Sequence, residues 1–138
     1  MNEAIIARAA EIMASTRDCV LALIDADGYP TAATITPSRT EGIKRIYIGN
    51  NIVSNWTKRA GNCNRASVCY TSSRPECNIT LVGAIDVLTT DLALKKEMWS
   101  PWMDMYYSGP DDPKFCVLRF NTKRYSLYVD GQQIRGTV

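Results

Sequence analysis

The segment from Trp99 to Pro113 constrains the fold most, because it is rich in large apolar side chains and is broken by proline. Two Trp, two Tyr and two Met lie within nine of its residues, and prolines stand at positions 101, 110 and 113. Each proline interrupts the backbone hydrogen bonding of a helix, so the segment cannot be one long regular helix. Large apolar side chains on an irregular segment need a cover. The sequence leaves three covers open: the core of this chain, a second subunit, or a flat ligand.

Length and composition indicate an ordinary globular protein. A chain of 138 residues predicts a single domain over residues 1–138, and 22% charged residues are typical of the soluble class. No stretch approaches the roughly 18 apolar residues that a membrane-spanning helix needs, so no membrane partner is expected. Residues 1–17 alternate apolar and polar side chains like an amphipathic helix and carry no secretory signal pattern. We therefore expect a cytoplasmic protein.

The cysteine and histidine counts exclude several kinds of site. Five cysteines, an odd number, argue against a disulfide framework, and the absence of histidine argues against a zinc site. Cys19 and Cys116 lie in apolar runs and are expected in the core. Without histidine there is no serine–histidine or cysteine–histidine nucleophile pair. Catalysis would therefore depend on carboxylates, hydroxyls, lysines, backbone dipoles or a cofactor, and we assign no catalytic residue and no metal ligand.

Apolar periodicity predicts a mainly β protein with short helices. Ser54 and Asp91 are good N-caps for helices over 55–60 and 92–99, and a first helix is expected over 3–15. The expected strands are 19–25, buried on both faces, then 29–36, 45–49, 66–71, 77–88 with a bulge or sharp bend at Gly83, 115–120 and 125–130. The last two form a hairpin around residues 121–123, and the polar tail 131–138 is expected to fray. No βαβ unit repeats, so a closed or nearly closed antiparallel barrel fits better than a Rossmann sheet.

Positive charge and hydroxyl groups gather in the middle of the chain. Seven basic residues and one acid lie between Arg39 and Arg74, a pattern that fits either a solvated basic face or a site for an anion such as phosphate. The N-terminus of the helix after Ser54 offers free backbone N–H groups to such an anion, although Ser54 can equally be an ordinary N-cap. The residues that would form this cradle are Thr34, Thr36, Ser38, Gly49, Asn50, Ser54, Asn55 and Lys58.

The order of motifs along the chain resembles a known family. The series is Asp27-Gly28, Pro30 to Thr34, Ile46 to Ala60, Asn64 to Val68, the Gly83 strand and Ser108 to Pro113. From about Arg8 to Asp130 this order is similar to the FMN-binding split-barrel superfamily, the pyridoxamine phosphate oxidase-like proteins, and most of all to their general-stress-protein branch. The resemblance implies a six-stranded antiparallel Greek-key split barrel that forms a homodimer with FMN at the interface.

The resemblance also implies roles for individual residues. Thr34, Ile35 and Thr36 would lie at the flavin ring, and the strand end and helix start 49–55 would hold the ring edge and the phosphate, with Lys58 nearby. Trp99 or Trp102 would cover the ring. Two family cations are missing, because Ala33 stands where many relatives have arginine and Trp56 where the true oxidases have lysine. Lys58, Arg39 or Arg74 would have to compensate. The C-terminal Trp and Arg of the true oxidases are also missing, so pyridoxamine phosphate oxidation is not expected.

Three functions follow from this reasoning. The first is a flavin-dependent oxidoreductase that passes a hydride between a nicotinamide dinucleotide and an unidentified small molecule. The alternative is a non-catalytic, stress-related dimer that holds FMN or another flat cofactor such as a deazaflavin or haem. The third is a small barrel that binds single-stranded nucleic acid. It is disfavoured because the aromatic residues lie far in sequence from the basic stretch.

Overall fold

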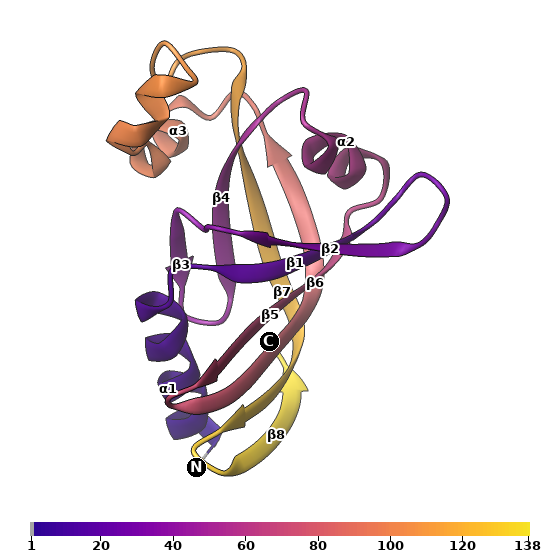
Figure 1. The fold of residues 1–138 in the computed structure, drawn as a ribbon, viewed down its shortest axis with the longest axis vertical. Coiled ribbons are helices and arrows are strands. Elements are labelled where there is room, and N and C mark those ends of the chain that lie inside the picture. The colour runs from indigo at the N-terminus through magenta and orange to yellow at the C-terminus, as the bar shows by residue number, and fades with distance from the viewer. Residues whose placement is uncertain (1) are drawn as a thin grey trace.

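The computed structural model describes residues 2–138, which form one antiparallel sheet with short helices at its ends (Figure 1). The helices are α1 (Asn2–Ser15), α2 (Asn55–Asn62), α3 (Leu92–Met98) and the 3-10 helix η1 (Pro101–Met105). The strands are β1 (Cys19–Ile24), β2 (Pro30–Ile35), β3 (Arg39–Glu41), β4 (Arg45–Asn51), β5 (Arg65–Ser73), β6 (Glu76–Leu88), β7 (Phe115–Val129) and β8 (Gln132–Thr137). The predicted mainly β class is confirmed.

The strands pair in the antiparallel order of a split barrel. Hydrogen-bonded neighbours run β2-β1-β5-β6-β7-β4-β3, and β8 pairs with the second half of β7. Every pairing is antiparallel, and within residues 2–138 β2, β3 and β8 each pair with a single neighbour, so each has a free edge. Figure 1 shows the long β6–β7 pair running the length of the molecule, with α1 at one end and α2 and α3 at the other. The split-barrel prediction is confirmed, with eight strands instead of six because β3 and β8 were not predicted.

Two hydrophobic clusters hold the sheet together. The main cluster joins the inner face of the sheet to α1, whose predicted apolar stripe is buried as expected: Ile5, Ala9, Ile12 and Met13. Cys19 and Cys116 lie in this cluster, as predicted. The second cluster lies between β4, the start of β7 and the segment that holds α3 and η1. Its buried members are Tyr47, Met98, Met103, Phe115 and Val117, with Leu94, Trp99 and Tyr107 packed against them.

The prediction that β1 is buried on both faces is wrong. Leu21 and Leu23 are each 1% exposed, whereas Val20 on the opposite face is 39% exposed. The run of apolar residues misled the prediction, because both faces are apolar but only one meets the core. The outer face of β1 is therefore an uncovered apolar surface.

The predicted C-terminal hairpin is also wrong. Residues 121–123 continue a single strand, β7, and the true hairpin joins β7 to β8 through Asp130 and Gly131. Both turn residues have positive φ, 51° and 77°, a backbone conformation that Asp tolerates and Gly adopts freely. The polar tail forms β8, paired along its length with β7, where fraying had been expected.

Candidate functional site

Strand β2 presents an open edge. It pairs with β1 only, and its other edge meets no strand in the described part of the chain. Ala32, Ala33 and Thr34 are exposed and Ile35 is half-buried. Thr36, just beyond the strand, donates its hydroxyl to Asp18 Oδ1 at 2.6 Å. Thr34 and Ile35 thus lie on a free backbone edge that could hydrogen-bond a flat ligand, while the Thr36 hydroxyl already has a partner.

Two predicted residues at the end of β4 have structural explanations. A Cβ at Gly49 would lie 2.8 Å from Met103 Cε and 3.1 Å from Phe115 Cε1, so glycine here lets the second cluster pack against β4. Asn50 Oδ1 accepts a hydrogen bond from the backbone N–H of Asn51 at 2.7 Å, which shapes the turn into α2. Ser38, beside the middle of β4, is exposed and donates its backbone N–H to the Tyr47 carbonyl.

Ser54 is the N-cap of α2. Its Oγ accepts the backbone N–H of Thr57 at 3.2 Å and lies 3.0 Å from the Thr57 hydroxyl, which itself donates to the Asn51 carbonyl. The N-cap interpretation is therefore confirmed. Asn55 and Lys58 line a cleft of about 470 Å³ between α2 and the β1–β2 turn. Asp25 and Asp27 line the same cleft, so Lys58 shares it with two acidic residues.

Arg59 connects α2 to the open edge strand. Its Nη1 donates to Thr31 Oγ1 at 2.7 Å, and its Cζ lies 5.2 Å from the centroid of the Trp56 ring. Side chains alternate along a strand, so Thr31 and Ala33 share one face of β2. A single guanidinium therefore contacts the Trp56 ring and the face of β2 that also carries Ala33, and these are the two positions where the resemblance led us to expect cations. The sequence did not identify Arg59, because only the tertiary contact between α2 and β2 brings it there.

The other cations named for compensation lie elsewhere. Arg39 is engaged by Glu97, with Nη1 to Oε2 at 3.5 Å, and by the ring of Tyr47, 5.5 Å from its Cζ. Arg74 lies in the turn between β5 and β6. Lys58 and Arg59 are thus the cations beside the predicted cradle.

The aromatic segment is divided between the interior and the surface. Trp99 packs edge-on against Phe115 and Tyr107, with ring centroids 5.3 and 6.2 Å apart, and belongs to the second cluster. Trp102 and Tyr106 point outward, 55% and 66% exposed, with their ring centroids 6.1 Å apart. The chain's own core therefore covers Trp99, whereas no described residue buries Trp102.

The Ser108–Pro113 motif has a structural role. The carboxylate of Asp112 accepts backbone N–H groups from Ser108 and Lys114, each at 2.9 Å, and these bonds hold its pKa below the usual range. The Asp112 carbonyl accepts a hydrogen bond from the buried Lys95 Nζ at 3.2 Å. The motif thus ties α3 and the aromatic segment to the start of β7.

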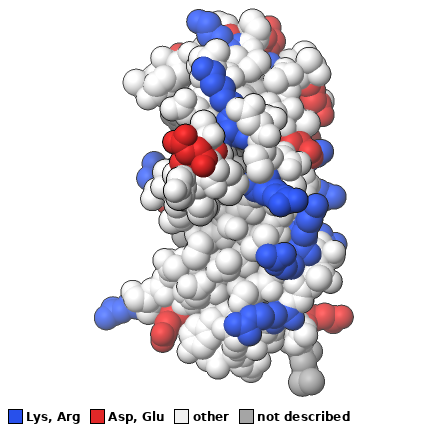
Figure 2. Space-filling model, turned by 90° about the vertical axis from the view of Figure 1, so that its right-hand side faces the viewer, with Lys and Arg blue, Asp and Glu red and all other residues white. Residues whose placement is uncertain are grey.

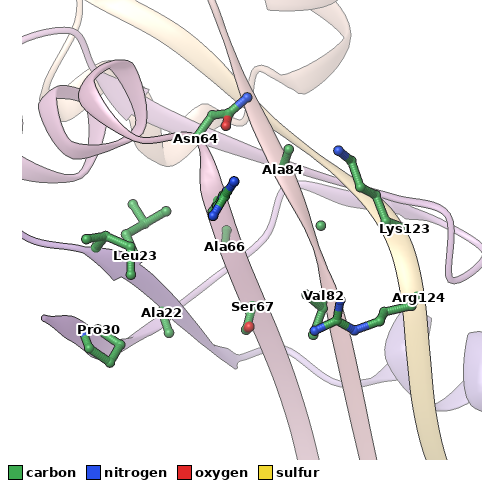
Figure 3. A pocket seen from close by; sticks show the side chains of 13 residues that line it. Ala22, Leu23, Pro30, Asn64, Ala66, Ser67, Val82, Ala84, Lys123 and Arg124 are labelled. Carbon is green, nitrogen blue, oxygen red and sulfur yellow. The ribbon is translucent and has the colours of Figure 1, made fainter. Parts of the chain in front are cut away.

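Another cavity lies on the outer face of the sheet. It has a volume of about 560 Å³ and is lined from β1, β5, β6 and β7, with Arg65, Lys123 and Arg124 among the lining residues (Figure 3). Sequence reasoning assigned residues 121–123 to a turn and missed this site. One signal was available: no Gly, Pro or Asp lies at positions 121–124, as a tight turn would favour.

The described residues contain no helix long and apolar enough to cross a membrane, and no group of three potential metal-binding His, Cys, Asp or Glu side chains.

Comparison with known proteins identifies relatives by sequence family and by fold. Residues 5–133 match the family described as pyridoxamine 5'-phosphate oxidase like. No curated protein sequence matches the chain. The fold is similar to a Clostridium acetobutylicum protein related to general stress protein 26 of B. subtilis, with a TM-score of 0.83 and 22% identity over 100% of this chain and 97% of that one.

Two further solved structures share the fold. A pyridoxamine 5'-phosphate oxidase-related, FMN binding protein from Nostoc punctiforme has a TM-score of 0.72 and 11% identity, covering 99% of this chain and 95% of its own. A heme binding protein from Mycobacterium smegmatis has a TM-score of 0.76 and 21% identity, covering 96% of this chain and 57% of its own.

Proposed function

The chain belongs to the pyridoxamine 5'-phosphate oxidase-like family, and on that premise we propose that it binds FMN as a homodimer and acts as a flavin-dependent oxidoreductase. One observation carries the proposal: the exposed, unpaired edge of β2 lies beside the Arg59 side chain of α2. A flat ring can hydrogen-bond along a free strand edge, and a phosphate can bind a guanidinium at the same place. The site has one wall, and a second subunit would supply the other.

The uncovered apolar surfaces support a dimer. Ala32 of β2 and Val20 of β1 are exposed on the outer face of the sheet, Ala33 is exposed on the opposite face of β2, and Trp102 is exposed at the aromatic segment. Exposed apolar surface of this kind marks interaction sites in soluble proteins. In the proposed dimer, Trp102 of one subunit covers the ring that lies along β2 of the other. Trp99 does not serve as this cover, because it is engaged in its own subunit's second cluster.

The residues present fit FMN, but the phosphate would bind Arg59 in place of the two cations expected at positions 33 and 56. Bound FMN would supply hydride-transfer chemistry, which amino-acid side chains do not provide. Thr34 and Ile35 would face the ring, with Thr36, Ser38, Gly49 and Asn50 shaping the strand ends around it. Arg59 would bind the phosphate, with Lys58 and Asn55 on the same helix. A charge-assisted contact contributes roughly 1.5–3 kcal/mol, so Arg59 offsets part of the loss at Ala33 and Trp56.

An FMN titration tests the proposal. Flavin fluorescence would be followed for the wild type, for Arg59→Ala and for Arg74→Ala, a matched arginine in the β5–β6 turn. We expect Arg59→Ala to weaken FMN binding by about tenfold or more and Arg74→Ala to leave it unchanged. Absence of wild-type binding at about 50 µM FMN would refute the flavin assignment. Ser54→Ala is a poorer probe, because it removes the N-cap of α2 as well.

Measurements of the molecular mass in solution and of nicotinamide oxidation test the dimer and the oxidoreductase activity separately. Light scattering after size exclusion should give twice the chain mass, and a monomer in the presence of FMN would refute the shared site. Oxidation of NADPH or NADH by the FMN-loaded protein would support the oxidoreductase. Retained FMN without such oxidation would favour the alternative, a non-catalytic cofactor-binding dimer. The replacement of the family's cations at Ala33 and Trp56 is the observation that favours this alternative.

A further inference from the structure

We propose that the cavity on the outer face of β1, β5, β6 and β7 is a second binding site, which takes a small phosphorylated organic molecule. Its volume of about 560 Å³ falls within the range of small-molecule sites. None of the residues predicted to hold FMN lines it. The site therefore stands apart from the proposed flavin site in its residues and goes beyond the proposed function.

A β-bulge builds the cationic wall of this cavity. Thr122 of β7 pairs with Gly83 of β6, and Arg124 pairs with Val82, so Lys123 is an extra residue in β7. Before the bulge the even-numbered residue Phe120 is buried, and after it the odd-numbered Leu127 is buried. The extra residue shifts the alternation by one and leaves two consecutive side chains on the outer face. Figure 3 shows Lys123 and Arg124 both extending from β7 toward β6, with the Arg124 side chain reaching β6 beside Val82.

The bulge depends on Gly83. A Cβ at this position would overlap the carbonyl oxygen of Asn121, a backbone atom of β7. Only glycine therefore permits the close approach of β6 and β7 that the extra residue requires. Bulges often redirect side chains beside functional sites, and this one places two cations side by side.

The cations of the cavity lack counter-charges. Arg65, Lys123 and Arg124 form no ion pair among residues 2–138, and no Asp or Glu in that range lines the cavity. Figure 2 looks onto the side of the molecule that carries α2 and the β1–β2 turn, where Lys and Arg side chains form a column. Three unneutralised cations around one hollow create a positive potential that an anion would relieve.

The remaining lining indicates the rest of the ligand. Arginine forks match phosphate geometry, and Ser67 adds a hydroxyl group on the same face. Ala22, Val82 and Ala84 provide an apolar floor too large for inorganic phosphate alone, which fits an organic body attached to the phosphate. The exposed aromatic residues Tyr29, Trp102 and Tyr106, which could stack on bases, do not line the cavity. A small phosphate ester therefore fits better than a nucleic acid strand.

Calorimetry with phenyl phosphate, with inorganic phosphate as the comparison, tests the site. We expect saturable binding of phenyl phosphate, weaker binding of inorganic phosphate, and affinities that fall with added salt. Arg124→Ala and Lys123→Ala should each weaken phenyl phosphate binding by about tenfold. Lys96→Ala, which removes an exposed cation from α3, should leave it unchanged.

Several results would overturn the proposal. No saturable binding up to about 10 mM phenyl phosphate, or equal loss in Lys96→Ala, would reject the site. Stoichiometric competition by FMN would show that the cations belong to the flavin site instead. Tighter binding of oligo(dT) than of phenyl phosphate would show a nucleic acid surface instead. If Arg124→Ala dissociated the subunits without changing the affinity for phenyl phosphate, the cations would belong to the interface between subunits. Phenyl phosphate binding in protein that fails to bind FMN would support this proposal while refuting the flavin site.

Discussion

Substitution of Gly83 by alanine should destabilise the protein more than any other glycine-to-alanine change in the sheet. The added Cβ would overlap the Asn121 carbonyl oxygen and lie 2.9 Å from the Asn121 carbonyl carbon and 3.1 Å from Thr122 Cα. All three atoms are backbone of β7, so no side-chain rotation can relieve the contact. The strands would have to separate at the bulge, where Gly83 and Thr122 are buried. We expect a loss of about 3 kcal/mol in the free energy of unfolding, at the upper end of ordinary overpacking.

Two other glycines give a graded comparison. At Gly49 the nearest atom is Met103 Cε, the flexible end of a side chain, so Gly49→Ala should cost about 1–2 kcal/mol. At Gly61, inside α2, an added Cβ meets nothing within 4 Å. Gly61→Ala should therefore stabilise the protein by about 0.5–1 kcal/mol through helix propensity and the unfolded state.

Urea denaturation at one fixed protein concentration measures the series, since association would otherwise change the apparent stability. For a chain of this length, a loss of about 3 kcal/mol corresponds to a fall in Tm of roughly 10 °C. The reasoning fails if Gly83→Ala lies within about 0.5 kcal/mol of the wild type, or if it is better tolerated than Gly49→Ala. Gly83→Ala should also weaken phenyl phosphate binding, because the bulge positions Lys123 and Arg124.

Three further predictions concern the Cys19 thiol, the Lys95 ammonium group and the two tryptophans of the aromatic segment. Burial raises the pKa of the Cys19 thiol from 9.0 to about 11, so the thiol ionises at a lower pH in the unfolded chain than in the folded one. The free energy of unfolding should therefore fall as pH rises from 9 to 11. In urea denaturation, the midpoint should fall less steeply over this pH range for Cys19→Ala than for the wild type. Lys95→Met should lower the free energy of unfolding, measured by urea denaturation, by about 2 kcal/mol, because the carbonyls of Thr89 and Asp112 lose their hydrogen-bond donor. The control Lys96→Met, on the exposed side of α3, should leave the free energy of unfolding unchanged. Trp99→Ala should lower the free energy of unfolding by about 3–4 kcal/mol, because packing in the second cluster is lost. Trp102→Ala should change it by no more than about 0.5 kcal/mol but should weaken FMN retention. A larger loss of stability in Trp102→Ala than in Trp99→Ala would contradict the division of the aromatic segment between interior and surface.

Features that depend on local chemistry were predictable from the sequence. The apolar stripe of α1 and the N-caps Ser54 and Asp91 are confirmed, because neighbouring residues determine each of them. The bulge or bend predicted at Gly83 is confirmed as a bulge whose extra residue lies in the partner strand β7. The ordered motifs also predicted the split barrel. These elements needed no knowledge of contacts between distant strands.

Features that depend on pairing were not predictable in the same way. A hairpin turn and a bulge both shift the alternation of buried residues, and the polar run 121–124 fits either. The lack of Gly, Pro and Asp at these positions disfavours a tight turn, and the partner strand β6, which continues past Gly83 without a break, decides for the bulge. The role of Arg59 was hidden for the same reason, since its contact with Thr31 joins segments 28 residues apart in the sequence.

The aromatic segment and the open strand edge together argue for one arrangement of the proposed dimer. The segment leaves Trp102 and Tyr106 exposed after Trp99 and Met103 are packed, and β2 leaves a strand edge exposed after pairing with β1. A twofold dimer needs two mutually complementary patches on the same subunit, because each contact occurs twice. An apolar aromatic patch and an apolar strand with a free backbone edge meet that requirement. If they pair across the twofold axis, Trp102→Ala and a charged substitution at Ala32 should disrupt the same contact, and their effects on dimer dissociation should not add.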